Sequence, residues 1–205
     1  MKLVLATSNK GKLREFIRLF SELMPGLPLT LTLGSEEGLS PVGETGSTFV
    51  ENARIKAMAA AAESGKLCLA EDSGLEVDFL DGAPGVKSHR FSESGSDDDN
   101  NMLLLKKMEG VPEPKRTARY RSAICIASPR GIVAEGLGTV EGYITTELRG
   151  SGGFGYDPLF YCPELGKTMG EASAAEKDSV SHRRRAMEVV TRNLMAAALA
   201  EEGLA

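Results

Sequence analysis

The start of the chain combines a short apolar strand, a polar loop and an amphipathic helix, and this order constrains the fold more than any other feature. We expect the strand over residues 3–6 and the loop over 7–11, where hydroxyl groups, an amide and lysines gather. Apolar residues then recur at helical spacing from Leu13 to Leu23. Such a loop presents backbone N–H groups and the positive end of a helix dipole, for which phosphate is the natural ligand.

This segment is not the P-loop of nucleoside triphosphatases. That motif needs glycine where this chain has Ala6, and serine or threonine where it has Leu13. An ordinary strand–turn–helix with a lysine-rich start therefore stays open as the alternative interpretation.

Length and charge bound the class of protein. A chain of 205 residues fits a single α/β domain over 1–205, with room for two lobes and a full core. The net charge of −5 argues against a nucleic-acid-binding surface as the main function, although a pocket in an acidic protein can be locally basic.

The cysteines and the lack of long apolar stretches suggest a compartment. Cys68, Cys125 and Cys162 lack metal-ligand spacing, which predicts buried free thiols in a reducing environment. No signal peptide or transmembrane stretch is visible in this sequence, so we expect a cytoplasmic protein that does not act at a membrane.

Strand and helix patterns alternate through the first half of the chain, and a hairpin follows. This order predicts an α/β fold with a mixed central β-sheet flanked by helices. We expect further helices from a capping box at Thr48 and Glu51 to Gly65, from Ser96 to Met108, and from about Ser181 onward, and strands over 67–70, 117–127, 132–140 and 159–161.

Two adjacent acids, Glu71 and Asp72, stand where we expect the buried strand 67–70 to stop. Polar working groups of open α/β sheets usually lie at such strand ends. Buried carboxylates are costly unless a cation compensates them, and Mg²⁺ prefers one or two carboxylates together with phosphate oxygens. Glu44 could supply another oxygen. The alternative is a pair of solvated acids at a turn, which Asp-Ser-Gly also favours.

A glycine-rich loop over 150–158 and a basic stretch over 179–185 are the other unusual segments. Phe154 stands among glycines, so a nucleotide base could stack on its ring for about 1–3 kcal/mol. Cations at the start of the last helix oppose its dipole, and an anionic or carbonyl-bearing ligand would explain Arg183. The alternatives are a flexible loop that tucks Phe154 into the core and a solvated basic face at Arg184 and Arg185.

Six motifs in this order resemble the inosine triphosphate pyrophosphatase family, whose members are also called XTP/dITP diphosphatases. The resemblance extends from Leu3 to the last helix. Two departures keep the needed chemistry: Ser8 stands where many relatives have glycine, and Glu71 where many have aspartate. The motifs are Thr7–Lys12, Glu44–Gly46, Glu51–Ala53 with Lys56, Glu71–Gly74, Gly152–Pro158 and Ser181–Arg183.

The resemblance implies a two-lobed α/β fold with a substrate cleft between the lobes, and a homodimer. It implies magnesium-dependent hydrolysis of ITP, dITP and XTP to the monophosphate and pyrophosphate, which cleanses the nucleotide pool and prevents incorporation into DNA and RNA. Asp72 would be the catalytic proton acceptor and a metal ligand with Glu44 and Glu71. The implied substrate-binding residues are Thr7, Ser8, Asn9, Lys10, Gly11, Lys12 and Lys56 for the phosphates, Ser73 for the nucleotide, Phe154, Gly155, Tyr156 and Asp157 covering the base, and Lys177, His182 and Arg183 reading its edge.

Selectivity for these bases has a physical explanation. Hypoxanthine and xanthine carry a carbonyl acceptor at position six, where adenine carries an amino donor. Donors from Arg183, His182 or loop amides would face that donor when ATP enters, and each unsatisfied polar group costs about 1–3 kcal/mol. Two alternatives stay open: a nucleotide-binding module without turnover, and a Maf-like or broader nucleotide pyrophosphatase or phosphatase acting on other bases.

Overall fold

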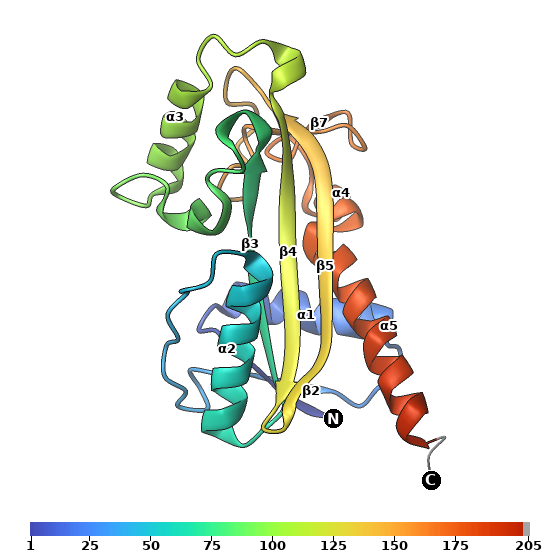
Figure 1. Ribbon diagram of the computed structural model, residues 1–205. Helices are drawn as coiled ribbons and strands as arrows, with labels where there is room; N and C mark the ends of the chain where they lie inside the picture. Colours follow the sequence, from blue (N-terminus) through green and yellow to red (C-terminus); the bar gives the residue numbers. More distant parts are fainter. Residues whose placement is uncertain (203–205) are drawn as a thin grey trace. The chain divides into compact units, whose positions relative to one another are not determined.

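The computed structural model describes residues 1–202, and the side chains of residues 1–196. Its strands form one seven-stranded sheet in the order β2-β1-β3-β4-β5-β6-β7 (Figure 1). β1 pairs in parallel with both β2 and β3, whereas β6 pairs antiparallel with β5 and β7. The expected mixed sheet is therefore confirmed. The strands are β1 (Lys2–Leu5), β2 (Thr30–Leu33), β3 (Cys68–Val77), β4 (Thr117–Ser128), β5 (Gly131–Ile144), β6 (Phe160–Cys162) and β7 (Lys167–Thr168).

Three of the helices begin where the sequence predicts them. Thr48 and Glu51 form the expected capping box at the start of α2, and Gly65 ends that helix in the left-handed conformation. Ser96 caps α3, and α5 begins directly after Ser181. The described residues also form three 3₁₀ turns, η1 (Asp78–Leu80), η2 (Gly85–Arg90) and η3 (Glu113–Lys115). The α-helices are α1 (Lys10–Leu23), α2 (Phe49–Ser64), α3 (Asp97–Lys107), α4 (Ala174–Val180) and α5 (His182–Glu202). Residues 203–205 of the expected last helix and domain lie outside the described residues.

The chain divides into two compact units, each assembled from separate stretches. The first unit contains residues 1–72, 122–138 and the chain from Arg185 onward, and the second contains 73–121 and 139–184. In the core of the first unit, Phe16 of α1 and Met187 of α5 pack with Leu69 and Ile124 of the sheet. The core of the second unit gathers buried residues of β3, α3, β4, β5 and β6.

Strand β3 differs from the sequence expectation. It does not stop at Glu71 but continues through Asp-Ser-Gly74 to Val77, so the expected strand end and turn are wrong. The reason is that β3 lies inside the sheet, between β1 and β4, and not at its edge. Gly74 marks a close approach instead of a turn, because a Cβ there would lie 2.3 Å from Ser88 Oγ.

The three cysteines are free and buried, as the sequence predicts. Among the described residues, the helices are too short or too polar to cross a membrane.

Candidate active site

The loop before α1 is organised by Asn9. Its side-chain oxygen caps the helix by accepting from the backbone N–H groups of Gly11 and Lys12, at 2.7 and 3.1 Å. The N–H group of Asn9 itself donates to Thr7 Oγ1 at 3.2 Å. Several of the amides expected to face a phosphate thus already have an acceptor, and a ligand would have to displace Asn9. Ser8 and Lys10 are exposed beside them, and the first turn of α1 contains no acidic residue.

Glu71 and Asp72 point to opposite faces of the sheet, because neighbouring residues of a continuous strand alternate in direction. Glu71 contacts Lys12 of α1, and Asp72 contacts Lys56 of α2. The sequence interpretation treated the two acids as neighbours at one strand end. In the structure each has its own environment and its own lysine.

Asp72 lies at the centre of a hydrogen-bonded cluster on the α2 side. Its Oδ1 accepts from Lys56 Nζ at 2.9 Å, and its Oδ2 accepts from Asn52 Nδ2 at 3.0 Å. The same lysine donates to Glu44 Oε1 at 2.8 Å. Asn52 also accepts from the N–H group of Gly46, which ties the Glu44 loop to the cluster. One ammonium group therefore joins two carboxylates.

Burial shapes the protonation of this cluster. It raises the pKa of the Asp72 carboxyl above its usual value, and the charge of Lys56 and the hydrogen bonds from Lys56 and Asn52 only partly oppose this effect. Burial by itself would lower the pKa of Lys56, but attraction to Asp72 and Glu44 outweighs it and the pKa is raised. A more basic carboxylate beside a firmly protonated lysine is suited to accept a proton while the lysine stays charged.

Glu71 belongs to a second charged pair in the same unit. Its Oε2 lies 2.7 Å from Lys12 Nζ, and its Oε1 accepts from Ser122 Oγ at 3.1 Å. Glu71 is nearly fully buried, so the lysine compensates a charge that would otherwise be costly. This pairing holds Lys12 next to the loop that precedes α1.

The described residues contain no group of three or more His, Cys, Asp or Glu side chains placed to hold a metal ion. The expected set of Asp72, Glu44 and Glu71 is thus not assembled, because Glu71 faces the other side of β3. Glu44 and Asp72 do converge on one cationic group, Lys56 Nζ. Two carboxylates around a cation position fit Mg²⁺, which takes its remaining ligands from phosphate and water.

In the second unit, Phe154 presents its ring to solvent, with 59% of the residue exposed. The alternative in which this ring enters the core is therefore wrong. Asp157 organises the loop below it: Oδ2 accepts from the Phe154 N–H group at 2.9 Å and from Lys177 Nζ, and Oδ1 accepts from Tyr120 Oη at 3.3 Å. Lys177 Nζ lies 5.1 Å from the centre of the Phe154 ring. Asp157 is itself buried, so it positions the loop.

Gly153 permits this arrangement. It has a φ of +80°, and a Cβ there would lie 2.1 Å from Asp157 Oδ2 and 2.7 Å from Lys177 Nζ. Only glycine combines that backbone conformation with that space. The glycine density of the loop thus reflects both conformation and close contact.

Tyr156 is buried in the core of the second unit, and its hydroxyl donates to the carbonyl of Ser88 at 2.8 Å. Its side chain therefore faces the protein interior, and any contact with a base would come from its backbone. Gly155 follows Phe154 and is partly buried. Ser73, on β3, is also partly buried.

His182 and Arg183 occupy the first turn of α5, which Ser181 caps by accepting from the Arg183 N–H group at 3.2 Å. The ring of His182 stacks on Tyr120, with 5.1 Å between centroids. Arg183 is buried, which distinguishes it from the partly exposed Arg184 and Arg185. Arg183 is therefore not part of a solvated face, whereas that alternative stays open for Arg184 and Arg185.

Three residues of these clusters were missed from the sequence: Asn52, Ser122 and Tyr120. Asn52 is fully buried and links Asp72 to the Glu44 loop. A signal existed, since Asn52 lies inside one of the six motifs. Ser122 and Tyr120 lie on β4, and nothing in their local sequence marks them.

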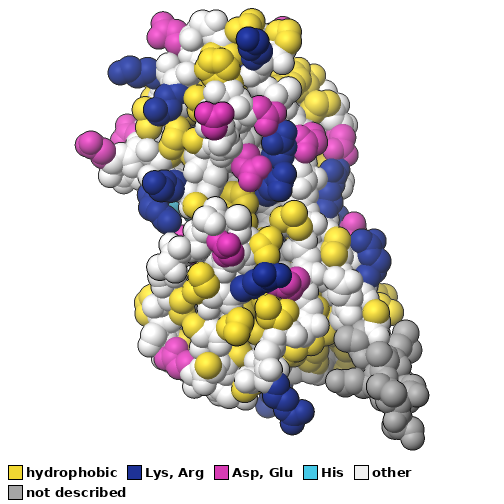
Figure 2. Space-filling model, viewed as in Figure 1, with side chains coloured by type: hydrophobic (Ala, Val, Ile, Leu, Met, Phe, Trp, Pro, Cys, Tyr) yellow, Lys and Arg dark blue, Asp and Glu magenta, His cyan; other side chains and the backbone are white. Residues whose placement is uncertain are grey.

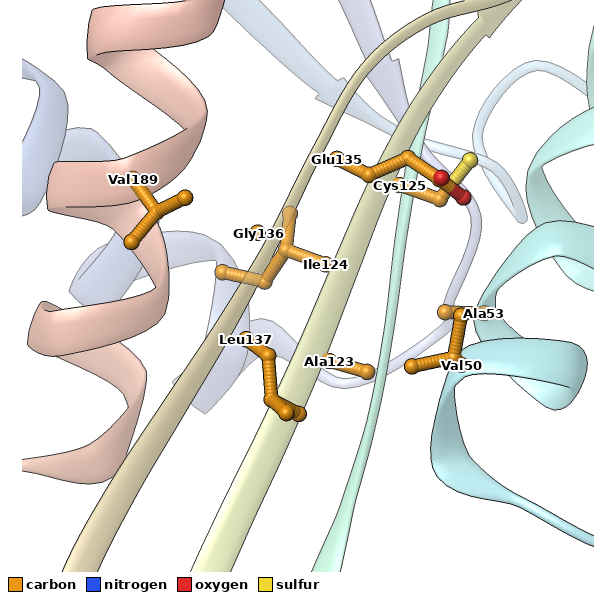
Figure 3. A pocket seen from close by; sticks show the side chains of 9 residues that line it. All are labelled: Val50, Ala53, Ala123, Ile124, Cys125, Glu135, Gly136, Leu137 and Val189. Carbon is orange, nitrogen blue, oxygen red and sulfur yellow. The ribbon is translucent and has the colours of Figure 1, made fainter.

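A pocket of about 220 Å³ in the first unit lies apart from these residues (Figure 3). Apolar side chains such as Val50, Leu137 and Val189 line it, together with Cys125 and Glu135. Glu135 accepts two hydrogen bonds from Arg54, at 2.5 and 2.7 Å. A triphosphate would find an acid and apolar groups there, so this pocket does not suit the expected substrate.

Comparisons with known proteins agree with the motif order. The model of the Ham1 family matches residues 3–193. The chain belongs to the Ham1 family. A relative from Desulforamulus reducens, named dITP/XTP pyrophosphatase, is 50% identical over 94% of this chain and 96% of its own. One of the same name from Listeria monocytogenes is 43% identical over 95% of each chain.

Two solved Ham1 structures have the same fold. The Staphylococcus aureus Ham1 protein is 39% identical, with a TM-score of 0.83 over 98% of this chain and all of that one. A HAM1 protein from Coxiella burnetii is 35% identical, with a TM-score of 0.84 over 98% and 99% of the two chains. The likeness covers both units.

Proposed function

We propose that this protein hydrolyses noncanonical purine nucleoside triphosphates, the class that contains ITP, dITP and XTP, to the monophosphate and pyrophosphate. The observation that carries the proposal is the Glu44–Lys56–Asp72 cluster, in which a buried carboxylate shares a lysine with a second acid. The names of the Ham1 relatives support the same reaction. Removal of these nucleotides would keep them out of DNA and RNA.

The first unit supplies the groups that bind phosphate. The loop from Thr7 to Gly11, with Ser8, Asn9 and Lys10, would take the triphosphate at the start of α1, where the helix dipole and two lysines favour an anion. Lys12 and Lys56 would neutralise charge as the anhydride breaks, which is the main catalytic need of phosphoryl transfer.

Magnesium is the proposed cofactor, held by Asp72 and Glu44. Bound there with phosphate oxygens, it would polarise the anhydride and offset its charge. Asp72 would accept the proton of the attacking water as the bond between the α- and β-phosphates breaks. Asn52 would hold this carboxylate in place during the transfer through its hydrogen bond to Oδ2.

The second unit supplies the groups that bind the purine. The exposed Phe154 ring offers a stacking face for the base, and Ser73 would touch the nucleotide. Lys177, His182 and Arg183 are donors when protonated, and each suits the carbonyl at position six better than the amino group of adenine.

An assay of ITP, dITP, XTP, GTP and ATP with and without Mg²⁺ tests the proposal. We expect rapid release of pyrophosphate from the first three, little from ATP, and loss of activity in a chelator. Release of orthophosphate would favour a general phosphatase instead, and tight binding without turnover would favour a regulatory module. A preference for other bases would indicate the Maf-like alternative.

We also propose a homodimer in the cytoplasm. The free buried thiols support a reducing compartment.

Hydrophobic side chains gather on the face of the first unit shown in Figure 2, over α2 and the neighbouring strands, as dimer surfaces often do. Light scattering on the purified protein should give twice the chain mass, and Leu137→Glu, at the pocket of Figure 3, should reduce it toward one chain. A single-chain mass for the unmodified protein would contradict the dimer.

A further inference from the structure

Two side chains of helix α3 form hydrogen bonds with the loop that contains Phe154, and neither has a role in the proposed reaction. The N–H group of Gly155 donates to Asp97 Oδ2 at 2.7 Å, and its carbonyl accepts from Asn101 Nδ2 at 2.8 Å. Asp97 and Asn101 are four residues apart and therefore share one face of α3. Both polar backbone groups of Gly155 are thus held by one helix.

Asp157 holds the backbone of Phe154, the residue before Gly155, in the same way. It accepts from the Phe154 N–H group at 2.9 Å, and its own N–H group donates to the Phe154 carbonyl at 3.3 Å. All four polar backbone groups of Phe154 and Gly155 therefore have partners. An exposed ring on a surface loop is ordinarily free to move, but this one stands on a backbone that is held at four points.

We propose that Asp97 and Asn101 are positioning residues that hold the Phe154 ring ready to stack on the purine, and so set the affinity for the base without touching it. The inference rests on the proposed function, which assigns the ring to the purine. A ring already in its binding orientation does not have to be ordered when the nucleotide arrives.

The same hydrogen bonds limit which donors are available to contact the edge of the purine base. The N–H groups of Phe154 and Gly155 already donate to Asp157 and Asp97, so they are committed to holding the loop. Discrimination at position six then rests on side-chain donors, not on these two loop amides.

The kinetic test uses two variants with matched controls. Asp98 shares the charge and first turn of Asp97, and Asn100 is a buried amide like Asn101 but accepts from Ser92. We expect Asp97→Ala and Asn101→Ala to raise the KM for ITP about tenfold with kcat nearly unchanged, as the loss of one hydrogen bond implies. Asp98→Ala and Asn100→Ala should leave the KM unchanged. Asp97→Asn should restore most of the affinity, because its amide oxygen can still accept.

Two further measurements separate positioning from general destabilisation. Inorganic tripolyphosphate carries the phosphates without a base, so its inhibition constant should be the same in all variants. In a Phe154→Ala background, Asp97→Ala should raise the KM no further, because the ring that it positions is gone. An equal increase in both backgrounds would overturn the proposal.

A fluorescence measurement tests the clamp, the two hydrogen bonds that Asp97 and Asn101 make with Gly155, without an activity assay. The chain contains no tryptophan, so Phe154→Trp introduces a single reporter at the loop. Adding Asp97→Ala or Asn101→Ala should increase the fast local depolarisation of the indole, and adding Asp98→Ala should not. If purine triphosphates are not hydrolysed, the proposed function fails while this readout still reports the clamp. If ITP is hydrolysed but the Asp97 and Asp98 variants depolarise alike, the positioning role is wrong and the function stands.

Discussion

The carboxylate cluster of the first unit and the Phe154 loop of the second are built in contrasting ways. Around Asp72, side chains from α2 and β3 neutralise and hydrogen-bond one another in a mostly buried setting. Around Phe154, the backbone is held at every polar group while the side chain that would meet a ligand is exposed. The first region therefore sets the charges of its side chains, and the second sets the position of the exposed Phe154 ring.

This contrast predicts a separation in kinetics. Substitutions in the charged cluster should act mainly on kcat, because they change proton transfer and charge stabilisation in the transition state. Substitutions in the loop should act mainly on KM and on the choice of base, because stacking and edge contacts are already made in the bound ground state.

The largest effect is expected for Asp72→Asn, which keeps the shape of the side chain but removes the base. We expect kcat for ITP to fall about a hundredfold while ITP binding persists, since acid–base assistance is worth that order. Steady-state kinetics and a binding titration measure the two quantities. Glu135→Gln is the matched control, because Glu135 is also ion-paired in the first unit but lines the separate pocket. A kcat close to that of the unmodified enzyme would remove Asp72 from the mechanism.

Gly153→Ala should have the next largest effect, and in the opposite kinetic parameter. Its Cβ would collide with Asp157 Oδ2, separate that carboxylate from Lys177 and displace the Phe154 ring. We expect the KM for ITP to rise about tenfold or more, with a smaller change in kcat. Gly155→Ala is the control, because its φ is also positive at +59° but no atom lies within 4 Å of the added Cβ. Equal effects of the two would mean that backbone strain, not the contact, matters.

Arg183→Ala should change selectivity more than rate. If the buried guanidinium faces the carbonyl at position six, its loss should narrow the ratio of kcat/KM for ITP over ATP by about tenfold. Competition between the two nucleotides in one reaction gives this ratio directly. The neighbouring Arg184, whose Nε donates to the Asp178 carbonyl at 3.2 Å, provides the control Arg184→Ala. An unchanged ratio in Arg183→Ala would place selectivity in other residues.

The sequence predicted what local chemistry determines. The capping box of Thr48 and Glu51 and the cap at Ser96 depend on residues within one helical turn, and both are present. Short elements without a full period, such as β2 and α4, were not predicted. The motif order also gave the family, which the Ham1 match confirms.

The face of the sheet to which each site residue points was not predictable from the sequence, because it depends on residues that are distant along the chain. Whether Glu71 and Asp72 share a side is decided by the continuation of β3 between its neighbours, which a local Asp-Ser-Gly signal misrepresents. The contact of Asp97 with Gly155 joins residues 58 positions apart. No spacing rule relates such residues, so the clamp became visible only in the folded chain.

The smallest expected effect concerns pH and tests whether the two faces of β3 act separately. Asn52 donates to Asp72 and favours its ionised form, so Asn52→Ala should raise the pKa of Asp72 further above its usual value. Because the ionised form is the proposed base, kcat/KM should fall as pH falls through this pKa, and the acid limb of the profile should move to higher pH. The sign for stability is opposite: the folded state binds this proton more tightly than the unfolded state, so this group's contribution to stability declines as pH rises from 3.8 through the folded pKa.

Ser122→Ala is the matched control for that profile, since it removes a hydrogen bond from Glu71 on the opposite face. Its acid limb should coincide with that of the unmodified enzyme, because Glu71 is paired with Lys12 on the other face of β3, away from Asp72. A shift of equal size in both variants would mean that the two carboxylates titrate as one group. The division of labour between the faces of β3 would then be lost, and with it the reason for assigning the proton to Asp72 alone.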